Sequence, residues 1–156
     1  MHKVGCDNLA MNLIAPGGQA SAHLRFHDHG LVQIGAAGAA IGGLTTAILV
    51  VNNLRDLETD AAVGKRTLAV RLGVRGTQAE YVLMLAVAYV VPAVGIVWLG
   101  WPAAVSWAYL TLPLCVPPVR TVLRYQDPAQ LFPVLGQTSR VVAAYGLLLT
   151  LGLTLA

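Results

Sequence analysis

Two aspartates, Asp56 and Asp60, follow closely on a long apolar stretch of the sequence, and their spacing is that of about one helical turn. No charged residue occurs from Gly30 to Leu54. If that stretch is a helix that continues to residue 60, Asn52 and Asn53 share a face with the two acids, within an arc of about 100°. The sequence therefore predicts a polar stripe at the end of an apolar helix.

Two carboxylates one turn apart, with about 6 Å between their Cβ atoms, repel each other unless a positive charge lies between them. Mg²⁺ can supply that charge, because proteins typically hold it with one or two carboxylates, substrate phosphates and water. Lys65 and Arg66 follow a few residues later and are suited to phosphate oxygens. Acids for a metal and bases for a phosphate together predict a diphosphate-binding site.

An alternative interpretation of the same residues is a solvated helix end, whose acids pair with the neighbouring bases. The spacing alone does not separate the two interpretations. The location favours the metal site, because charge at the membrane edge of a helix is costly and usually functional.

The composition indicates the environment of this helix. Hydrophobic residues make up 56% of the chain and charged residues 11%, against about 25% charged residues in soluble domains. The mean hydropathy is +0.67. These values predict a membrane protein in contact with the lipid bilayer. The net charge of +3 is attributed to orientation in the membrane, and no nucleic-acid partner is expected.

The predicted fold class is all-α, a polytopic transmembrane bundle of four membrane helices. A span needs about 20 apolar residues, and the first is Leu31–Leu54. The uncharged stretch Tyr81–Val119 is too long for one span, and Gly100 and Pro102 divide it into two helices with a tight turn between them. The last span ends near Leu155.

The basic residues predict the orientation of these spans. Eight of the ten Lys and Arg residues lie between the first and second spans or between the third and fourth. With four spans, both charged loops face the same side, which the positive-inside rule makes cytoplasmic. A multi-pass protein of the cell inner (plasma) membrane is expected. The eight residues are Arg55, Lys65, Arg66, Arg71, Arg75, Arg120, Arg124 and Arg140.

Two further patterns concern helix packing and the membrane interface. The first span contains Gly38-x-x-x-Gly42, and small residues at this spacing let helix backbones approach closely. Unspecific Ala/Gly composition is the alternative interpretation. Trp98, Trp101 and Trp107 flank the uncharged turn and predict an aromatic belt at that interface.

Residues 1–30 differ from the rest and are interpreted as a polar, mobile leader of unclear origin, without a signal-peptide pattern. His23 and His27 would share a helix face and could bind a metal. Gly and Pro surround them, so the leader is the favoured interpretation.

The segment Asn52-Asn53-x-x-Asp56-x-x-x-Asp60, followed by GKRTLAVRLG from Gly64, resembles the second aspartate-rich motif of the UbiA superfamily of intramembrane prenyltransferases. Within that family, the sequence of this segment is most similar to that of the enzymes that prenylate 1,4-dihydroxy-2-naphthoate. GQTSRVVAAYGLLLTLGL, from Gly136 to Leu153, is similar to the family's final helix. The resemblance covers residues 31–156, which are therefore interpreted as the C-terminal part of a prenyltransferase membrane domain.

The resemblance implies an enzyme that transfers a polyprenyl group from a polyprenyl diphosphate to 1,4-dihydroxy-2-naphthoate with loss of the carboxylate, in menaquinone or phylloquinone biosynthesis. It implies Mg²⁺ as the cofactor. Asp56 and Asp60 match the catalytic, metal-binding acids of the motif. The diphosphate-binding positions are matched by Asn52, Asn53, Lys65 and Arg66.

The four predicted helices resemble helices six to nine of the UbiA fold, and the family's first aspartate-rich motif has no counterpart before Asn52. The isolated chain is therefore expected to be inactive. A non-catalytic membrane fragment, and a subunit of a split enzyme whose partner chain supplies the missing helices, are the alternatives. Another alternative is a UbiA-type enzyme with a different aromatic acceptor.

Overall fold

A computed structural model describes the backbone of residues 19–155 and the side chains of residues 31–155. All elements in this part of the chain are helical, and no strand occurs among residues 19–155. The helices are α2 (Gln19–Arg55), α3 (Leu57–Ala62), α4 (Leu68–Trp98), η2 (Ala103–Thr111), α5 (Leu112–Arg124), η3 (Pro128–Leu131) and α6 (Phe132–Thr154).

The chain divides into two units, residues 1–34 and 35–156. The first contains the beginning of α2, which starts at Gln19. The leader hypothesis for residues 1–30 and the metal hypothesis at His23 and His27 concern side chains outside the described residues. Everything below concerns the second unit.

Three helical stretches are long and apolar enough to cross a membrane, namely Leu31–Arg55, Leu68–Trp98 and Pro128–Thr154. They correspond to three of the four predicted spans. The second stretch begins at Leu68 rather than near Tyr81, because in α4 a short polar helix precedes the long apolar one and is joined to it across a kink at Gly73. Gly73 interrupts this helix with a φ of 69°, in a region of backbone conformation that glycine adopts readily.

The segment predicted as the third span is divided between the 3₁₀ helix η2 and the α-helix α5. Three prolines, Pro113, Pro117 and Pro118, lie in α5. Each removes a backbone N–H donor, which limits regular i→i−4 hydrogen bonding in this segment. The tight turn predicted before it is confirmed: Gly100 has a φ of 69°, and the Trp101 N–H donates to the Gly95 carbonyl at 3.0 Å.

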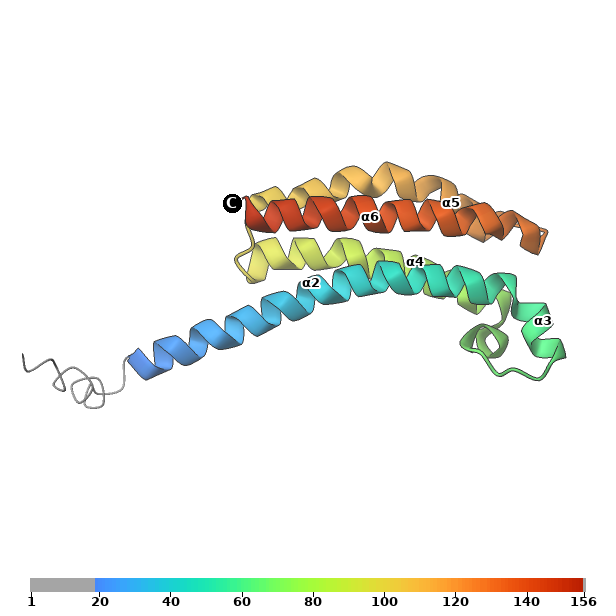
Figure 1. Cartoon of the computed structure of the whole chain (residues 1–156), viewed down its shortest axis with the longest axis horizontal. Helices are drawn as coiled ribbons and strands as arrows, with labels where there is room; N and C mark the ends of the chain where they lie inside the picture. The colour runs from blue at the N-terminus through green and yellow to red at the C-terminus, as the bar shows by residue number, and fades with distance from the viewer. Residues whose placement is uncertain (1–18, 156) are drawn as a thin grey trace, which may run out of the picture. The chain divides into compact units, whose positions relative to one another are not determined.

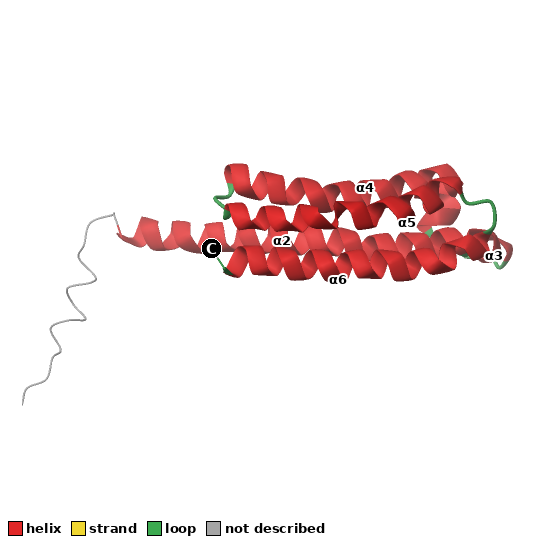
Figure 2. Cartoon of the chain, turned by 90° about the horizontal axis from the view of Figure 1, so that it is seen from above, coloured by secondary structure: helices red, strands yellow, loops and turns green. Residues whose placement is uncertain are grey.

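The polar connections lie at one end of the helices of the second unit (Figures 1 and 2). The loop between α3 and α4 and the connection between α5 and α6 are at this end, which we call the charged end. The uncharged turn between α4 and η2 and the end of α6 lie at the other. The shared placement of the two charged loops is as the sequence predicted.

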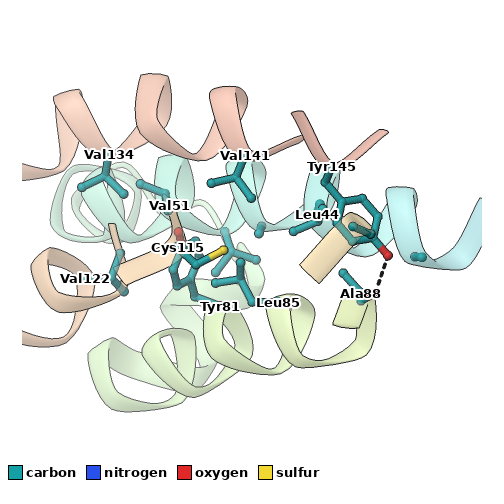
Figure 3. Packing of buried hydrophobic residues seen from close by; sticks show 14 of the residues in the cluster. Leu44, Val51, Tyr81, Leu85, Ala88, Cys115, Val122, Val134, Val141 and Tyr145 are labelled. Atoms are coloured by element: carbon teal, nitrogen blue, oxygen red, sulfur yellow. Dashed lines mark hydrogen bonds between the residues drawn. The ribbon is translucent and has the colours of Figure 1, made fainter. Parts of the chain in front are cut away.

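The interior of the second unit is formed by side chains from α2, α4, η2, α5 and α6 (Figure 3). Tyr81 and Leu85 of α4 lie beside Cys115 of α5, and Tyr145 of α6 lies beside Leu44 of α2; Tyr81, Tyr145 and Leu44 are fully buried. Because lipid is as apolar as these side chains, tight packing rather than water exclusion holds such helices together.

Hydrogen bonds between helices supplement this packing. The hydroxyls of Tyr81 and Thr138 are 2.9 Å apart and join α4 to α6. The Tyr145 hydroxyl donates to the Ala88 carbonyl, as Figure 3 shows. Tyr89 joins α4 to η2 through the Thr111 hydroxyl at 2.7 Å. Each bond satisfies a polar group that lipid could not satisfy.

Close backbone contacts occur at glycines other than the predicted ones. A Cβ atom on Gly152 of α6 would lie 2.6 Å from the Ala104 carbonyl oxygen of η2. At Gly43 of α2 it would lie 3.1 Å from the Met84 carbonyl oxygen of α4. By contrast, nothing lies within 4 Å of a Cβ on Gly38 or Gly42. The prediction of a close helix contact at these two residues is therefore wrong within the described chain.

Of the three tryptophans predicted to form an aromatic belt, two are exposed and one is buried. Trp98 is 75% exposed and Trp107 is 42% exposed, as residues of an interface would be. Trp101 is 5% exposed, because its indole packs over Gly95, where a side chain would collide with the ring. Trp101 therefore belongs to the core at this turn.

Candidate functional site

The polar stripe predicted at residues 52–60 lies where α2 passes into α3, at the charged end (Figure 1). The Asp56 N–H donates to the Asn52 carbonyl at 3.1 Å, and the Asp60 N–H donates to the Asp56 carbonyl at 2.8 Å. Helical hydrogen bonding thus continues across the junction, although α2 ends formally at Arg55. The two aspartates are one turn apart, as predicted, but Asp56, with a φ of −90° and a ψ of 6°, separates α2 from α3, so the predicted unbroken helix to residue 60 is not observed.

Each aspartate is paired with a base. Both carboxylate oxygens of Asp56 accept hydrogen bonds from the Arg55 guanidinium, at 2.7 and 2.8 Å. One oxygen of Asp60 accepts from the Lys65 ammonium at 2.9 Å. These pairs are what the solvated-helix-end interpretation predicts, and they relieve the repulsion between the two acids in this structure.

The two carboxylates differ in their surroundings. The side chain of Asp60 is only 11% exposed, whereas that of Asp56 is 35% exposed. The loop after α3 folds back, so that the Lys65 N–H also donates to the Asp60 carbonyl at 2.9 Å. Gly64, with a φ of 75°, makes this return possible. A nearly buried carboxylate with a single exposed lysine as its partner is well placed to exchange that partner.

The ion pairs perturb the groups that take part in them. The hydrogen bonds from Arg55 lower the pKa of Asp56, against the opposing effect of burial, and the charges of Arg55 and Lys65 lower it further. The hydrogen bond to Asp60 and the charge of that carboxylate raise the pKa of Lys65. Asp56 is therefore ionised near neutral pH and can act as an oxygen ligand.

The remaining predicted site residues lie on the same junction and loop. Asn52 and Asn53 are half-buried, and their side-chain amides have no hydrogen-bond partner within residues 31–155. Arg66 is exposed and forms no ion pair in the same part of the chain. The structure thus brings the four predicted diphosphate-binding residues to the end that carries the two acids.

The donor set is compatible with Mg²⁺ but does not by itself define a complete site. No cluster of three or more His, Cys, Asp or Glu side chains with metal-binding geometry occurs within the described residues. Two carboxylates and two free amide oxygens are nevertheless hard oxygen ligands, and Mg²⁺ takes few of its ligands from protein when phosphates supply others. Asp56 and Asp60 would hold the ion, once released from Arg55 and Lys65.

Two features of the charged end were not identified from the sequence. The Arg55 guanidinium lies over the Phe132 ring, 4.7 Å from its centroid, and so joins α2 to the start of α6. A pocket of about 360 Å³ is lined by Arg120, Thr121, Arg124, Tyr125 and Gln130. The four-residue spacing of its two arginines is visible in the sequence, but these arginines were interpreted there only as determinants of membrane orientation.

A multi-pass helical membrane protein with paired acids and bases at one end is the class that this geometry defines. Comparison with known proteins identifies the family, since residues 9–137 match the UbiA prenyltransferase family. The chain belongs to that family. The matched range begins within the segment 1–30. No solved structure gives a significant match.

Curated relatives share one name. A 1,4-dihydroxy-2-naphthoate octaprenyltransferase of Haemophilus influenzae is 38% identical over 119 residues, which is 72% of this chain and 36% of the relative. The protein of the same name from Mycobacterium tuberculosis is 37% identical over 134 residues, 84% of this chain and 42% of the relative. The Escherichia coli protein is 35% identical over 118 residues. The chain spans about two fifths of the length of these relatives.

Proposed function

We propose that this chain forms the second diphosphate-binding half of an aromatic prenyltransferase. The reaction is transfer of a polyprenyl group from polyprenyl diphosphate to 1,4-dihydroxy-2-naphthoate with loss of the carboxylate, in menaquinone or phylloquinone biosynthesis. The observation that carries the proposal is the pair Asp56 and Asp60, one turn apart on a helix end that lies beside Lys65, in a member of the prenyltransferase family. The names of the relatives support the acceptor.

The residues of the charged end have distinct roles in this proposal. Asp56 and Asp60 hold Mg²⁺, which when bound supplies the Lewis-acid neutralisation of a diphosphate leaving group. Lys65 and Arg66 bind phosphate oxygens, and Lys65 must leave Asp60 to do so. Asn52 and Asn53 supply neutral polar contacts from the same helix end.

The chemistry also requires that water be kept from the reacting carbon. Breaking the allylic C–O bond leaves a carbocation, with the bonding electron pair on the departing diphosphate. The aromatic ring attacks this cation, and an apolar helical environment protects it from water. The apolar helices that extend from the charged end into the membrane provide such an environment for the prenyl chain.

We further propose four membrane crossings, with the charged end in the cytoplasm and the protein in the inner (plasma) membrane. The segment η2–α5 is one of these crossings, in addition to the three stretches that are long and apolar enough to cross a membrane. Nine residues of 3₁₀ helix and thirteen of α-helix together extend about 38 Å, more than the roughly 30 Å of a hydrocarbon core. The two connections that carry most of the basic residues lie at the same end, which supports the orientation.

A second candidate function is that of a subunit of a split enzyme, to which a partner chain contributes further helices, or that of a non-catalytic membrane fragment. The uncovered face of α2 favours it, because nothing lies within 4 Å of a Cβ on Gly35, Gly38 or Gly42. Small residues at such spacing are suited to a close helix contact. Either candidate predicts that this chain is inactive alone. A UbiA-type enzyme with another aromatic acceptor is a variant of the first.

The test joins this chain, in trans or in one polypeptide, to the N-terminal part of an octaprenyltransferase relative. Prenylation of 1,4-dihydroxy-2-naphthoate is then assayed in membranes with Mg²⁺. Activity in the joined protein, and none in either part, supports the proposed enzyme. An assembled complex without activity towards any aromatic acceptor supports the non-catalytic candidate.

A further inference from the structure

A second group of bases at the charged end has no role in the proposed reaction. Arg120 and Arg124 lie one turn apart on α5 and line the pocket of about 360 Å³. Neither forms an ion pair in the described part of the chain. Two guanidinium groups this close repel each other unless an anion lies between them.

The other residues of the pocket add hydrogen-bond donors. The Tyr125 hydroxyl has no hydrogen-bond partner among residues 31–155. Its pKa is raised by burial and by the charge of Glu58, so the hydroxyl keeps its proton. The side-chain oxygen of Gln130 accepts from the Gln126 N–H at 3.1 Å, which leaves its NH₂ group as the unused donor.

The acids near the pocket do not neutralise the arginines. Asp127 is exposed, and its carboxylate accepts from the Ala129 N–H at 2.8 Å. Glu58 influences Tyr125 but pairs with neither arginine. The pocket therefore offers positive charge and hydrogen-bond donors to a ligand, and this combination of groups binds an oxyanion. Arginine forks match the geometry of phosphate in particular.

We propose that Arg120 and Arg124 form a binding site for a phosphate group, separate from the site at Asp56 and Asp60. The phosphate is presented either by the headgroup of an anionic membrane lipid or by a free phosphate or diphosphate ion. Exposed apolar side chains at Val116 and Leu123 of the same helix would contact the acyl chains of a lipid. Basic pockets at the cytoplasmic ends of membrane helices are suited to such headgroups.

The test measures ligand binding to the purified full chain in detergent by native mass spectrometry. The probes are phosphatidylglycerol, zwitterionic phosphatidylcholine and inorganic pyrophosphate. The double variant R120Q/R124Q is compared with R71Q/R75Q, which removes the same charge from two exposed arginines that lie on either side of the break at Gly73 in α4. R120K/R124K keeps the charge without the guanidinium fork. Circular dichroism establishes that each variant is folded.

R120Q/R124Q should weaken binding of the anionic probe by about tenfold or more, from the loss of two charge-assisted contacts. R71Q/R75Q should change it by less than about threefold, and R120K/R124K should give an intermediate loss. If R120Q/R124Q weakens the binding of phosphatidylglycerol only, the site binds a lipid headgroup. If it weakens the binding of pyrophosphate, the site binds a soluble ligand. Equal losses in the two glutamine variants, or none in R120Q/R124Q, would overturn the proposal. No catalytic step enters the readout, so its outcome is independent of the proposed function.

Discussion

Replacing Gly152 by alanine tests the contact between η2 and α6, on which the proposed membrane crossing by η2–α5 depends. The new Cβ would lie 2.6 Å from the Ala104 carbonyl oxygen and 2.7 Å from the Val105 Cα. Both neighbours are backbone atoms, which cannot move aside by a change of rotamer. The two helices must separate by about 1 Å to restore ordinary contact distances.

The cost follows from overpacking a close contact, about 1–3 kcal/mol. Gly146 of the same helix is the matched control, because nothing lies within 4 Å of a Cβ placed there. Alanine at this position should change the free energy of unfolding by about 0.5 kcal/mol or less, and towards greater stability, since alanine has the higher helix propensity.

The assay is reversible unfolding of the purified chain in mixed micelles by sodium dodecyl sulfate, followed by circular dichroism. G152A should unfold at a lower fraction of this detergent than the wild type, and G146A at the same or a higher fraction. Indistinguishable transitions for the two variants would mean that η2 does not pack on α6 as described.

Two further predictions concern single interactions. T138V removes the hydroxyl that bonds to Tyr81 and should cost about 1 kcal/mol in the same unfolding assay, whereas S139A, whose hydroxyl bonds only within its own exposed helix turn, should cost about 0.5 kcal/mol or less. R55Q should raise the pKa of Asp56 in a carboxyl NMR titration. With Arg55 present, the ionised Asp56 carboxylate stabilises the fold at pH values above its ordinary pKa of 3.8, and this stabilisation is lost as the pH falls through the lower pKa of the folded protein. R55Q should abolish this loss of stability at low pH. An unchanged titration of Asp56 in R55Q would refute the pairing.

Much of the fold could be predicted from hydropathy, because a bilayer admits few structures. Apolar stretches specified the helices near Leu31–Arg55 and Pro128–Thr154. The split of the third segment into η2 and α5 was not predicted, since it depends on how prolines and neighbouring helices share the available hydrogen bonds. The short polar helix before Gly73 in α4 was missed because polar helical residues carry no apolar signal.

Contacts between helices were less accessible from sequence than the helices themselves. The Gly38-x-x-x-Gly42 pattern indicated a close approach, but the structure has it at Gly43 and Gly152. Any small residue permits close contact, and only the three-dimensional arrangement decides which one a neighbour reaches. The assignment of Trp101 to the interface failed because it also depended on the three-dimensional arrangement: the turn at Gly100 directs this side chain into the core.

At the candidate site, helical periodicity was sufficient to place Asp56 and Asp60 one turn apart, because that spacing is local. The partners of the two acids were not predictable in the same way. Arg55 was not part of the predicted polar stripe, but its long side chain reaches the adjacent carboxylate. The pocket at Arg120 and Arg124 required the connection to α6 to be positioned first.

The most direct test of the central claim is Mg²⁺-dependent binding of a non-hydrolysable prenyl thiodiphosphate to the purified chain by isothermal titration calorimetry. The wild type should bind the analogue only with Mg²⁺. D56N and D60N should each weaken binding by at least about tenfold, because a direct ligand should contribute no less than a residue that merely orients one. E58Q, which removes an exposed acid from α3 outside the proposed ligand set, should bind as the wild type does. Equal affinities for D56N, D60N and the wild type, or binding that is indifferent to Mg²⁺, would contradict the account.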